Sequence, residues 1–389
     1  MPSPAAADVV VVGLGAHGSA AARALADRGA RVIGLERFGR GHDLGSSGGR
    51  TRIIRVAYFE HPSYVPLVLE AWQAWVDLEA ATGARILEPT GGLYAGPPNS
   101  EVFQGALRSS RQHGLPHEVL TATELRRRFP QFRVGDETSG IYEERAGLLR
   151  TAAALEAQLS LAERAGADLR FGVQVLGWGA TTTGITVGTD EGTIACGSLA
   201  LAAGAWTDTL LHGLDLGLWV ERVPVFWFEP PGGPEPVSAG HLPVWIFETA
   251  TDGTFYGFPY EPDAGLKVAR HHSGVRVDPD MVDRTATPAD EARVREFVRS
   301  HLPIADGPVR GSSVCLYTNT PDEHFVIDRH PDAPNVVFAS ACSGHGFKFS
   351  PVIGATLADL ALDGRTDRPV DFLRMDPAVR PSAAARTLS

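Results

Sequence analysis

Apolar runs and helix-like spacing alternate at the start of the chain. Four valines at residues 9–12 precede a glycine-rich stretch, and an Ala- and Leu-rich stretch at 19–28 leads to a second apolar run at 31–35. Short apolar runs bounded by turn residues predict buried parallel strands, and the stretch between them predicts a helix that Gly29 can end. The first forty residues therefore predict a strand–helix–strand unit.

The rest of the chain repeats these patterns and inserts a different one. Apolar spacing predicts helices over 66–82, 151–165, 289–301 and 347–362, and strands over 169–175, 185–187, 199–202 and 336–339. Residues 217–275 are instead dense in aromatic residues, Val and Pro, which is typical of an antiparallel sheet. The fold class is thus α/β with α+β elements, in which an antiparallel-sheet domain interrupts a Rossmann-like domain. We expect the Rossmann-like domain at 1–85, 146–216 and 311–389, the inserted domain at 86–145 and 217–310, and a site between them.

The turn of the first unit carries the pattern Gly-x-Gly-x-x-Gly at Gly13, Gly15 and Gly18, and Glu36 closes the second strand. The three glycines allow a tight turn, a close approach to a pyrophosphate and close packing of helix on strand. The helix start offers free N–H groups and a positive dipole end to that anion, and Glu36 can accept ribose hydroxyls. The pattern predicts a dinucleotide site, with a tight turn without ligand as the alternative, and it does not separate FAD from NAD.

Composition and charge narrow the classes of function. The 389 residues are 43% apolar and 21% charged, which is ordinary for a globular protein. The net charge of −11, without a basic block, argues against binding to nucleic acid or an anionic membrane. Cys196, Cys315 and Cys342 are too few and too far apart for a disulfide framework or a zinc site, and the histidines show no metal-ligand spacing. Residues 1–8 lack a signal-peptide pattern and no apolar run is long enough for a membrane span, so we expect a cytoplasmic protein.

Two stretches place cationic side chains beside glycines. Arg52 and Arg55 follow a Gly- and Ser-rich loop and would share one face of a helical turn, where an arginine fork suits a carboxylate. A solvated helix start is the alternative. Residues 343–350 form a glycine-rich approach to a helix, whose dipole and Lys348 could stabilise negative charge, although a plain helix cap is equally compatible.

On each of two predicted strands, candidate functional side chains lie two or four residues apart and therefore share one face. Lys267 and His271 point the same way from one arm of a predicted hairpin, either into a site or toward solvent. Cys315 and Tyr317 alternate in the same manner, although a lone cysteine is usually a small buried apolar residue.

Taken together, these segments resemble the monomeric sarcosine oxidase and N-methyltryptophan oxidase family of flavoproteins. The resemblance runs almost end to end with near-collinear spacing. The motifs that carry it are DVVVVGLGAHG at 8–18, TRIIR at 51–55 followed by Tyr58, AAGAW at 202–206, YGFP at 256–259, GLK at 265–267 followed by His271, CLYTNTPDEHFVID at 315–328 and SGHGFKFS at 343–350.

The resemblance implies that the Rossmann-like domain binds FAD. Cys315 resembles the cysteine that joins the flavin through an 8α-thioether, Lys267 the catalytic lysine that holds a water near flavin N5 and activates oxygen, and Arg52 the arginine under the flavin ring. The full set of cofactor contacts that the resemblance and the glycine motif imply is Gly13, Gly15, Ala16, His17, Gly18, Glu36, Arg37, His42, Ser46, Thr51, Arg52, Val175, Gly204, Trp206, Cys315, Gly344, His345, Gly346, Phe347 and Lys348.

The resemblance also implies a substrate site. Arg55 and Lys348 resemble the pair that holds the substrate carboxylate. His271, Tyr256 and Tyr317 resemble the catalytic groups that flank the substrate amine and methyl group.

The chain departs from the family pattern around this site. Ser47 and Gly48 stand where the family often has a His pair, and Arg50 stands where it has an acid. Phe247 falls near the position where a sarcosine oxidase has a flexible, unbranched residue in the pocket wall, so we expect Phe247 to contact substrate. Cys342 stands where the family commonly has a Phe beside the flavin loop. These changes bear on the side chain of the substrate more than on the reaction.

The resemblance implies a monomeric, FAD-dependent oxidase of a small N-methyl amino acid such as sarcosine. A hydride would pass from the carbon next to nitrogen to flavin N5, the imine would hydrolyse to release formaldehyde, and O2 would become H2O2. The alternatives are oxidation of a cyclic amino acid of the proline or pipecolate type or of a biosynthetic intermediate, a flavin dehydrogenase with another acceptor, and a non-catalytic flavin-binding module. Lys267 favours oxygen as the acceptor.

Overall fold

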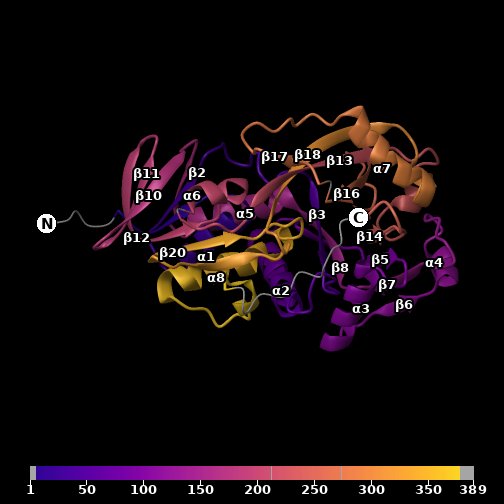
Figure 1. Cartoon of the computed structure of the whole chain (residues 1–389), viewed down its shortest axis with the longest axis horizontal. Helices are drawn as coiled ribbons and strands as arrows, with labels where there is room; N and C mark the ends of the chain where they lie inside the picture. Colours follow the sequence, from indigo (N-terminus) through magenta and orange to yellow (C-terminus); the bar gives the residue numbers. More distant parts are fainter. Residues whose placement is uncertain (1–5, 212, 273, 377–389) are drawn as a thin grey trace.

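The predicted strand–helix–strand unit lies inside a parallel part of a sheet. The structure is a computed structural model that describes residues 6–211, 213–272 and 274–376 (Figure 1). β1 (Ala7–Val12) pairs in parallel with β2 (Val32–Glu36), and α1 (Ala16–Asp27) connects them. Every residue of both strands except Asp8 is buried, as expected for strands that are covered on both faces.

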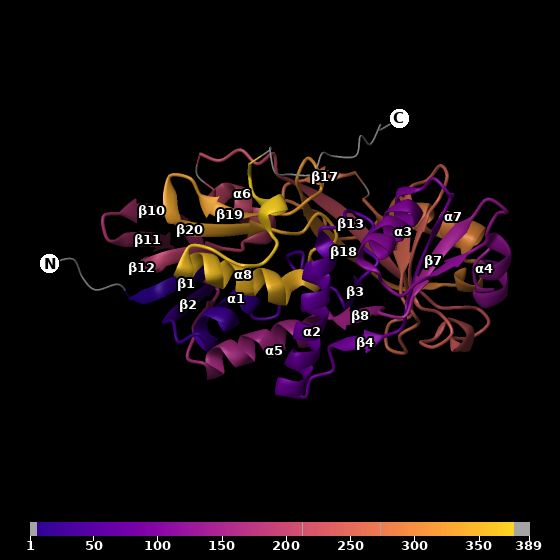
Figure 2. The same ribbon diagram turned by 90° about the horizontal axis from the view of Figure 1, so that it is seen from below.

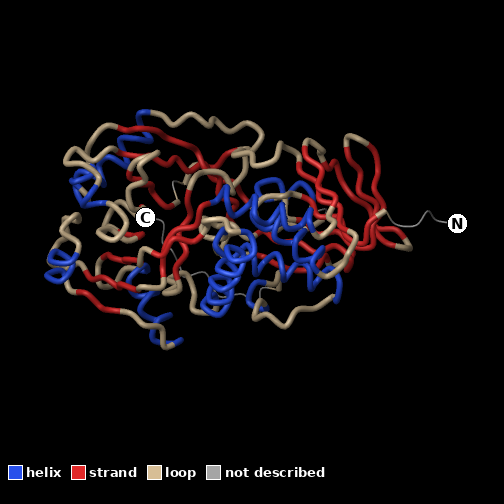
Figure 3. Tube along the Cα trace, turned by 180° about the vertical axis from the view of Figure 1, so that it is seen from behind, coloured by secondary structure: helices blue, strands red, loops and turns tan. Residues whose placement is uncertain are grey.

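This first sheet has eight strands within the described residues. In spatial order they are β10 (Val175–Thr181), β11 (Gly184–Thr189), β12 (Gly192–Leu201), β1, β2 and β9 (Asp168–Phe171), with β20 (Ala333–Ser340) beside β12 and β19 (Val326–His330) beside β20. The strand predicted over 169–175 is two strands, β9 and β10, because the chain turns at Gly172 with a φ of +80°. The β10–β11–β12 strands project from one end of the molecule (Figure 3).

Helices from distant parts of the sequence pack on α1. It contacts α5 (Thr151–Arg164) and α8 (Ser350–Asp363), and α2 (Tyr64–Thr82) packs on α8 (Figure 2). A Cβ at Gly354 would lie 2.5 Å from the Cβ of Ala20, so α8 needs glycine where it meets α1. The helix predicted over 347–362 begins as a 3₁₀ turn at Phe347–Phe349 and continues as α8.

The aromatic segment forms four strands of a second sheet, which has nine strands within the described residues. In spatial order they are β17 (Arg276–Val277), β13 (Trp219–Phe228), β16 (Leu266–His271), β15 (Thr254–Gly257), β14 (Val244–Glu248), β5 (Gly92–Gly96), β7 (Ser139–Glu143) and β6 (Glu118–Leu120), with β18 (Val309–Asn319) beside β13. The antiparallel prediction is confirmed for β13 to β16, while β14 and β5 pair in parallel.

Three helices flank the second sheet: α3 (Glu101–His113), α4 (Ala122–Arg128) and α7 (Pro288–His301). Phe297 of α7 stacks on Phe255 and Trp245, with ring centroids 4.2 and 5.6 Å apart, and so covers one face of β14 and β15. The short α6 spans Thr207–Leu210, and further 3₁₀ turns span Gly204–Trp206, Glu235–Val237, Pro303–Ala305 and Asp371–Leu373. Within the described ranges, no helix combines the length and the apolar character that crossing a bilayer requires.

A small third sheet joins the two parts and corrects one prediction. It consists of β3 (Thr51–Arg55), β8 (Ala146–Arg150) and β4 (Leu87–Pro89). The helical turn predicted for Arg52 and Arg55 is wrong, because both lie on β3, where they pair with Leu149 and Ala146 of β8. Residues three apart on a strand start on opposite faces, so the two arginines do not form a common fork.

The predicted domain boundaries stay a prediction, and β18 crosses one of them. The strand starts at Val309 and pairs with β13 along most of its length, although the Rossmann-like domain was expected to resume at residue 311. Cys315 therefore lies on a strand of the second sheet.

Candidate active site

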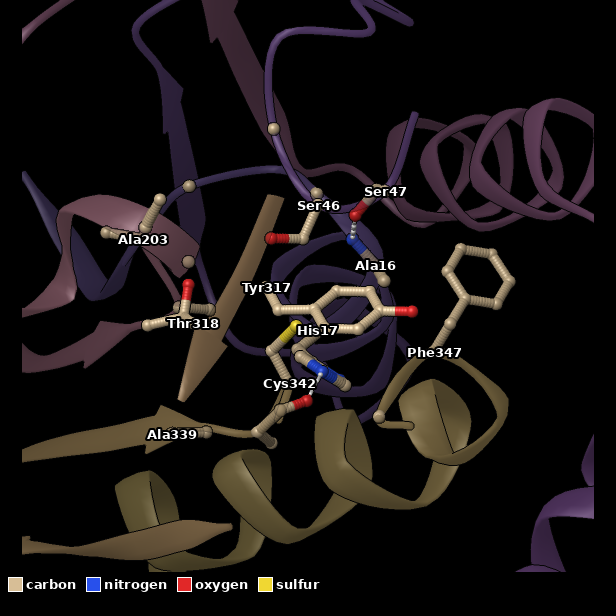
Figure 4. Close-up of a pocket in the computed structure, with 18 of the residues that line it drawn as sticks. Ala16, His17, Ser46, Ser47, Ala203, Tyr317, Thr318, Ala339, Cys342 and Phe347 are labelled. Atoms are coloured by element: carbon tan, nitrogen blue, oxygen red, sulfur yellow. Dashed lines mark hydrogen bonds between the residues drawn. The ribbon is translucent and has the colours of Figure 1, made fainter. Parts of the chain in front are cut away.

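A cavity is lined by both large sheets, by β3 and by the loop that leads into α8 (Figure 4). It brings together most of the residues that the sequence singled out. Of those, the cavity is lined by Gly13, Gly15, Ala16, His17, Glu36, Arg37, His42, Ser46, Arg52, Arg55, Val175, Gly204, Trp206, Tyr256, His271, Cys315, Tyr317, Gly344, His345, Gly346, Phe347 and Lys348. The predicted residues outside its lining are Gly18, Thr51, Phe247 and Lys267.

The glycine turn forms one end of the cavity. Gly13 has a φ of +85°, and a Cβ there would lie 2.6 Å from the carbonyl oxygen of Ala202. A Cβ at Gly18 would lie 1.7 Å from the oxygen of Gly13, so Gly18 serves packing beneath the turn. The first N–H of α1, at Ala16, donates to the hydroxyl of Ser47 at 2.9 Å (Figure 4). Ser47, noted above only as a departure, thus belongs to this end.

Glu36 has a structural use in addition to facing the cavity. Its two carboxylate oxygens accept the N–H groups of Leu14 at 2.9 Å and Phe38 at 3.0 Å, and His42 lies 3.4 Å away. Burial would raise the pKa of Glu36, but the hydrogen bonds from His42 and the two N–H groups bring it below its usual value. The carboxylate is therefore ionised and holds the glycine turn in place.

Arg52 lies beside Cys315 at the other end of the cavity. Its Nη2 is 3.6 Å from the Sγ of Cys315, and the guanidinium also donates to the carbonyl oxygens of Ser46, Gly48 and Thr51 at 3.0, 2.5 and 2.9 Å. The predicted alternation on β18 is confirmed, since both Cys315 and Tyr317 line the cavity. The sulfur therefore faces the cavity with a fixed positive charge next to it.

Lys267 lies behind the cavity wall. It is buried, and its Nζ donates to the carbonyl oxygen of Thr51 at 3.0 Å and lies 4.8 and 5.5 Å from the ring centres of Phe258 and Trp227. Burial, and then the charge of Arg52, lower its pKa to about 7. Among the described residues, the Oγ1 of Thr51 and the Nε1 of Trp227 are buried without a hydrogen-bond partner. This corner therefore holds polar atoms that a small polar molecule could pair.

A buried group of charges stands opposite, formed by Arg55, Glu60 and Lys348. Nη2 of Arg55 donates to both oxygens of Glu60 at 2.5 Å, and Nζ of Lys348 donates to the carbonyl oxygen of His345 at 2.6 Å. Arg55 and Lys348 both lie over the ring of Tyr58, at 4.2 and 5.3 Å from its centre. Nη1 of Arg55 is buried and has no partner within the described residues.

The pKa values within this group follow from burial and mutual attraction. Burial alone would raise the pKa of Glu60, but Arg55 lowers it to about 2. Burial and the charge of Arg55 lower the pKa of Lys348 to about 7. With Lys348 protonated, two cations face one carboxylate, and the net positive charge suits an anionic ligand.

Glu60 is the main residue that the sequence patterns did not indicate. It follows Arg55 by five residues, beyond a turn, and no local pattern pairs residues at that spacing.

The wall near this group is apolar and corrects the prediction for Phe247. Ile53, Phe59, Ile246 and Phe258 line the cavity. Phe247 does not, because successive residues of β14 point to opposite faces; its ring packs on Phe132 and Phe297 at 6.0 and 5.8 Å. Ile246, the neighbour of Phe247 on β14, therefore lies in the cavity wall in place of Phe247.

The loop that leads into α8 packs directly on the aromatic side of the cavity. Gly344 has a φ of +75°, and a Cβ there would lie 2.7 Å from both His271 and Tyr317. The ring of His345 bonds the hydroxyl of Tyr58 at 2.5 Å through Nδ1 and the carbonyl oxygen of Glu323 at 3.1 Å through Nε2. Burial lowers the pKa of His345 to about 3, so its ring is neutral.

No three His, Cys, Asp or Glu side chains come together as a metal site would require, within the ranges that the structure describes.

Comparison with known proteins identifies the family. The family of FAD dependent oxidoreductases named DAO matches residues 8–360. The monomeric sarcosine oxidase of Streptomyces avermitilis is 43% identical over 93% of this chain and 95% of its own length. The N-methyl-L-tryptophan oxidase of Yersinia pestis is 34% identical over 94% of this chain and 97% of its own length.

A solved structure agrees with these relatives. NikD, an unusual amino acid oxidase essential for nikkomycin biosynthesis, superposes with a TM-score of 0.83 at 27% identity, over 95% of this chain and 97% of that chain. The chain therefore belongs to the DAO family of FAD dependent oxidoreductases, among its flavoprotein amine oxidases.

Proposed function

We propose that the chain is an FAD-dependent oxidase of a small N-methyl amino acid such as sarcosine. The proposed products are an imine, which hydrolyses and releases formaldehyde, and H2O2 from O2. The observation that carries the proposal is the buried Nη1 of Arg55, which lacks an acceptor among the described residues, in a side chain that lines the cavity together with Lys348. A substrate carboxylate supplies the missing acceptor. The names of the relatives in Streptomyces and Yersinia support the same class of substrate.

FAD fits the residues of this cavity. Glycine at 13 and 18 lets the turn pack closely on Ala202 and on itself, and the first turn of α1 offers N–H groups and a positive dipole end to a pyrophosphate. Glu36, Arg37 and Trp206 line the adjoining part, where we place the adenosine. We keep 1–85, 146–216 and 311–389 as the proposed FAD-binding domain and 86–145 and 217–310 as the proposed substrate domain, with β18 crossing the boundary at residue 311.

We assign a covalent link to the flavin to Cys315. Cys315 lines the cavity, and its sulfur lies 3.6 Å from Nη2 of Arg52. If the link forms, yellow colour stays with the protein after acid precipitation and SDS. A Cys315→Ala variant should release its flavin under the same treatment. Complete release from the unaltered protein would refute the link.

The side chains around the substrate bind and orient it. Arg55 and Lys348 hold the carboxylate, so the adjoining carbon is presented in a fixed direction. Burial raises the pKa of Tyr256 to about 12 and also raises that of Tyr317, so both hydroxyls stay protonated beside the substrate amine and act as hydrogen-bonding groups. The apolar wall of Ile53, Ile246 and Phe258 excludes water. FAD held by these residues would supply the redox chemistry, namely hydride acceptance from the substrate and electron transfer to O2.

Lys267 is assigned to the oxygen reaction. Its Nζ has donors beyond the one that the Thr51 carbonyl oxygen uses. Thr51 and Trp227, which both contact the ammonium group, each keep a buried polar atom without a partner among the described residues, and this suits a held water molecule. Lys267→Met should leave reduction of the flavin by substrate nearly unchanged and slow its reoxidation by air. An unchanged rate of flavin reoxidation in this variant would show that Lys267 does not act in the oxygen reaction, and would favour a dehydrogenase with another electron acceptor.

A second candidate is oxidation of a cyclic amino acid or of a biosynthetic intermediate. The likeness to NikD, an unusual amino acid oxidase, favours it. A substrate panel with a peroxide readout separates the two. Turnover of N-methyl amino acids with release of formaldehyde supports the first proposal; turnover of proline- or pipecolate-type substrates alone supports the second. We further propose that the chain acts as a monomer in the cytoplasm, and gel filtration tests the first point.

A further inference from the structure

Glu143 is a buried carboxylate that none of the roles above uses. It ends β7, is 1% exposed and does not belong to the lining of the cavity. Its Oε1 accepts the N–H of Val56 at 3.0 Å and the hydroxyl of Tyr94 at 2.5 Å, and its Oε2 accepts the N–H of Ala57 at 3.0 Å. Burial raises the pKa of Glu143 to about 7, so above that pH the side chain is an ionised carboxylate. Its bonds to successive backbone N–H groups are then strong, charge-assisted contacts.

The two N–H groups belong to the segment that carries the carboxylate-binding charges. Val56 and Ala57 follow Arg55 directly and precede Glu60, so Glu143 fixes the backbone between the members of that ion pair. The same segment is held on its other side by α3. A Cβ at Gly105 would lie 2.2 Å from the carbonyl oxygen of Phe59, and the hydroxyl of Ser109 donates to the carbonyl oxygen of Tyr58.

We propose that Glu143 is a positioning residue for substrate binding, which sets the backbone of residues 56–57 so that Arg55 presents Nη1 to the substrate carboxylate. The proposal rests on the proposed function of Arg55. Glu143 does not line the cavity, so it acts through the Arg55–Glu60 segment.

A positioning role and a purely electrostatic role of Glu143 predict opposite changes in carboxylate affinity when its charge is removed. Removing a negative charge near Arg55 would by itself strengthen the binding of an anion. Removing the backbone anchor lets the segment move and weakens binding. The direction of change in carboxylate affinity therefore separates the two.

The experiment compares Glu143→Gln with the unaltered holoenzyme at mildly alkaline pH. Propionate is the probe, its Kd is read from the flavin absorbance, and hydrogen–deuterium exchange follows peptides that contain residues 55–60. We expect a roughly tenfold weaker Kd, since charge-assisted bonds are about twice as strong as neutral ones. Exchange in the segment should be faster. KM for an N-methyl amino acid should rise by a factor similar to that of the propionate Kd, while kcat should change by less than about twofold. For the carboxylate-free amide of the same amino acid, kcat/KM should stay unchanged.

Glu79→Gln is the matched control. Oε1 of Glu79 also accepts two successive backbone N–H groups, those of Ile86 and Leu87 at 2.6 and 3.0 Å, and Glu79 does not line the cavity. It should leave the propionate Kd unchanged. If Glu143→Gln does not fold, Tyr94→Phe removes one donor to the carboxylate and should weaken propionate by about two- to threefold.

The outcomes are distinct. Equal or tighter propionate binding in Glu143→Gln, or in Tyr94→Phe where the first variant does not fold, overturns the positioning role. An unaltered holoenzyme that binds propionate but oxidises no N-methyl amino acid contradicts the proposed substrate and leaves the test of Glu143 in force. An unaltered holoenzyme that binds no carboxylate contradicts both.

Discussion

Arg55 uses its two terminal nitrogens differently. Nη2 is bound to Glu60, whose carboxylate neutralises and orients the guanidinium, while Nη1 is buried without an acceptor within the described residues. A buried donor without a partner costs about 1–3 kcal/mol, which a carboxylate ligand regains. The ion pair therefore orients the guanidinium through Nη2 and leaves Nη1 for the substrate carboxylate that we propose.

Replacing Arg55 by methionine tests this division. A hydrogen bond to a charged group is worth about 1.5–3 kcal/mol, so we expect kcat/KM for an N-methyl amino acid to fall by about 10- to 100-fold. The carboxylate-free amide of the same substrate should lose less than about threefold. Arg50→Met, whose side chain is 46% exposed, is the control and should leave both values unchanged. Equal losses for acid and amide would show that Arg55 does not bind the carboxylate.

The lowered pKa of Lys348 predicts that carboxylate binding depends on pH. Its pKa is lowered to about 7 by burial and by Arg55, so its ammonium form is present below that pH and is lost as the pH rises through it. We therefore expect the Kd of propionate to increase as the pH rises through about 7, in titrations followed by flavin absorbance. The Lys348→Met variant should bind propionate weakly with little pH dependence. If the variant keeps the same profile, another group with a pKa of about 7, such as Lys267 or Glu143, is responsible.

At the scale of elements, the loop between β20 and α8 fixes the aromatic side of the cavity. Gly344→Ala introduces two effects: a Cβ at a φ of +75°, and contacts of 2.7 Å with His271 and Tyr317. Gly240→Ala isolates the first effect, because Gly240 has a φ of +94° and a Cβ there would meet nothing within 4 Å. The shared backbone strain costs about 1–2 kcal/mol, and overpacking adds about 1–3 kcal/mol at Gly344 only.

Denaturant unfolding of the two variants measures this difference. Gly344→Ala should show the larger loss in free energy of unfolding and, in addition, lower activity. Equal losses in the two variants would mean that the loop yields to the added methyl group and does not fix His271 and Tyr317.

Across the whole molecule, the sequence patterns predicted those helices, strands and site residues that depend on neighbours in the sequence. The β1–α1–β2 unit follows from an apolar run, a glycine turn and an Ala-rich helix, and α2, α5 and α7 follow from apolar spacing. Cys315 and Tyr317 follow from alternation on one strand. Each of these depends on residues that are close in the sequence.

The remaining features depend on contacts between distant segments. The spacing of Arg52 and Arg55 fits a helix as well as a strand, and only the ladder with β8 selects the strand. The phase of β14, which exchanges Phe247 for Ile246, is set by α7 packing on its other face. Glu143 reaches Val56 and Ala57 from 87 and 86 residues away. No pattern within one segment contains this information.

We propose that one cavity holds a cysteine-linked flavin next to a cationic carboxylate site. A crystal structure of the holoenzyme with propionate would show both features at once. We expect continuous density from the Sγ of Cys315 to the flavin, and propionate held by Nη1 of Arg55 and Nζ of Lys348. Propionate bound elsewhere, with Arg55 engaged only by Glu60 and the sulfur of Cys315 apart from the flavin, would contradict it.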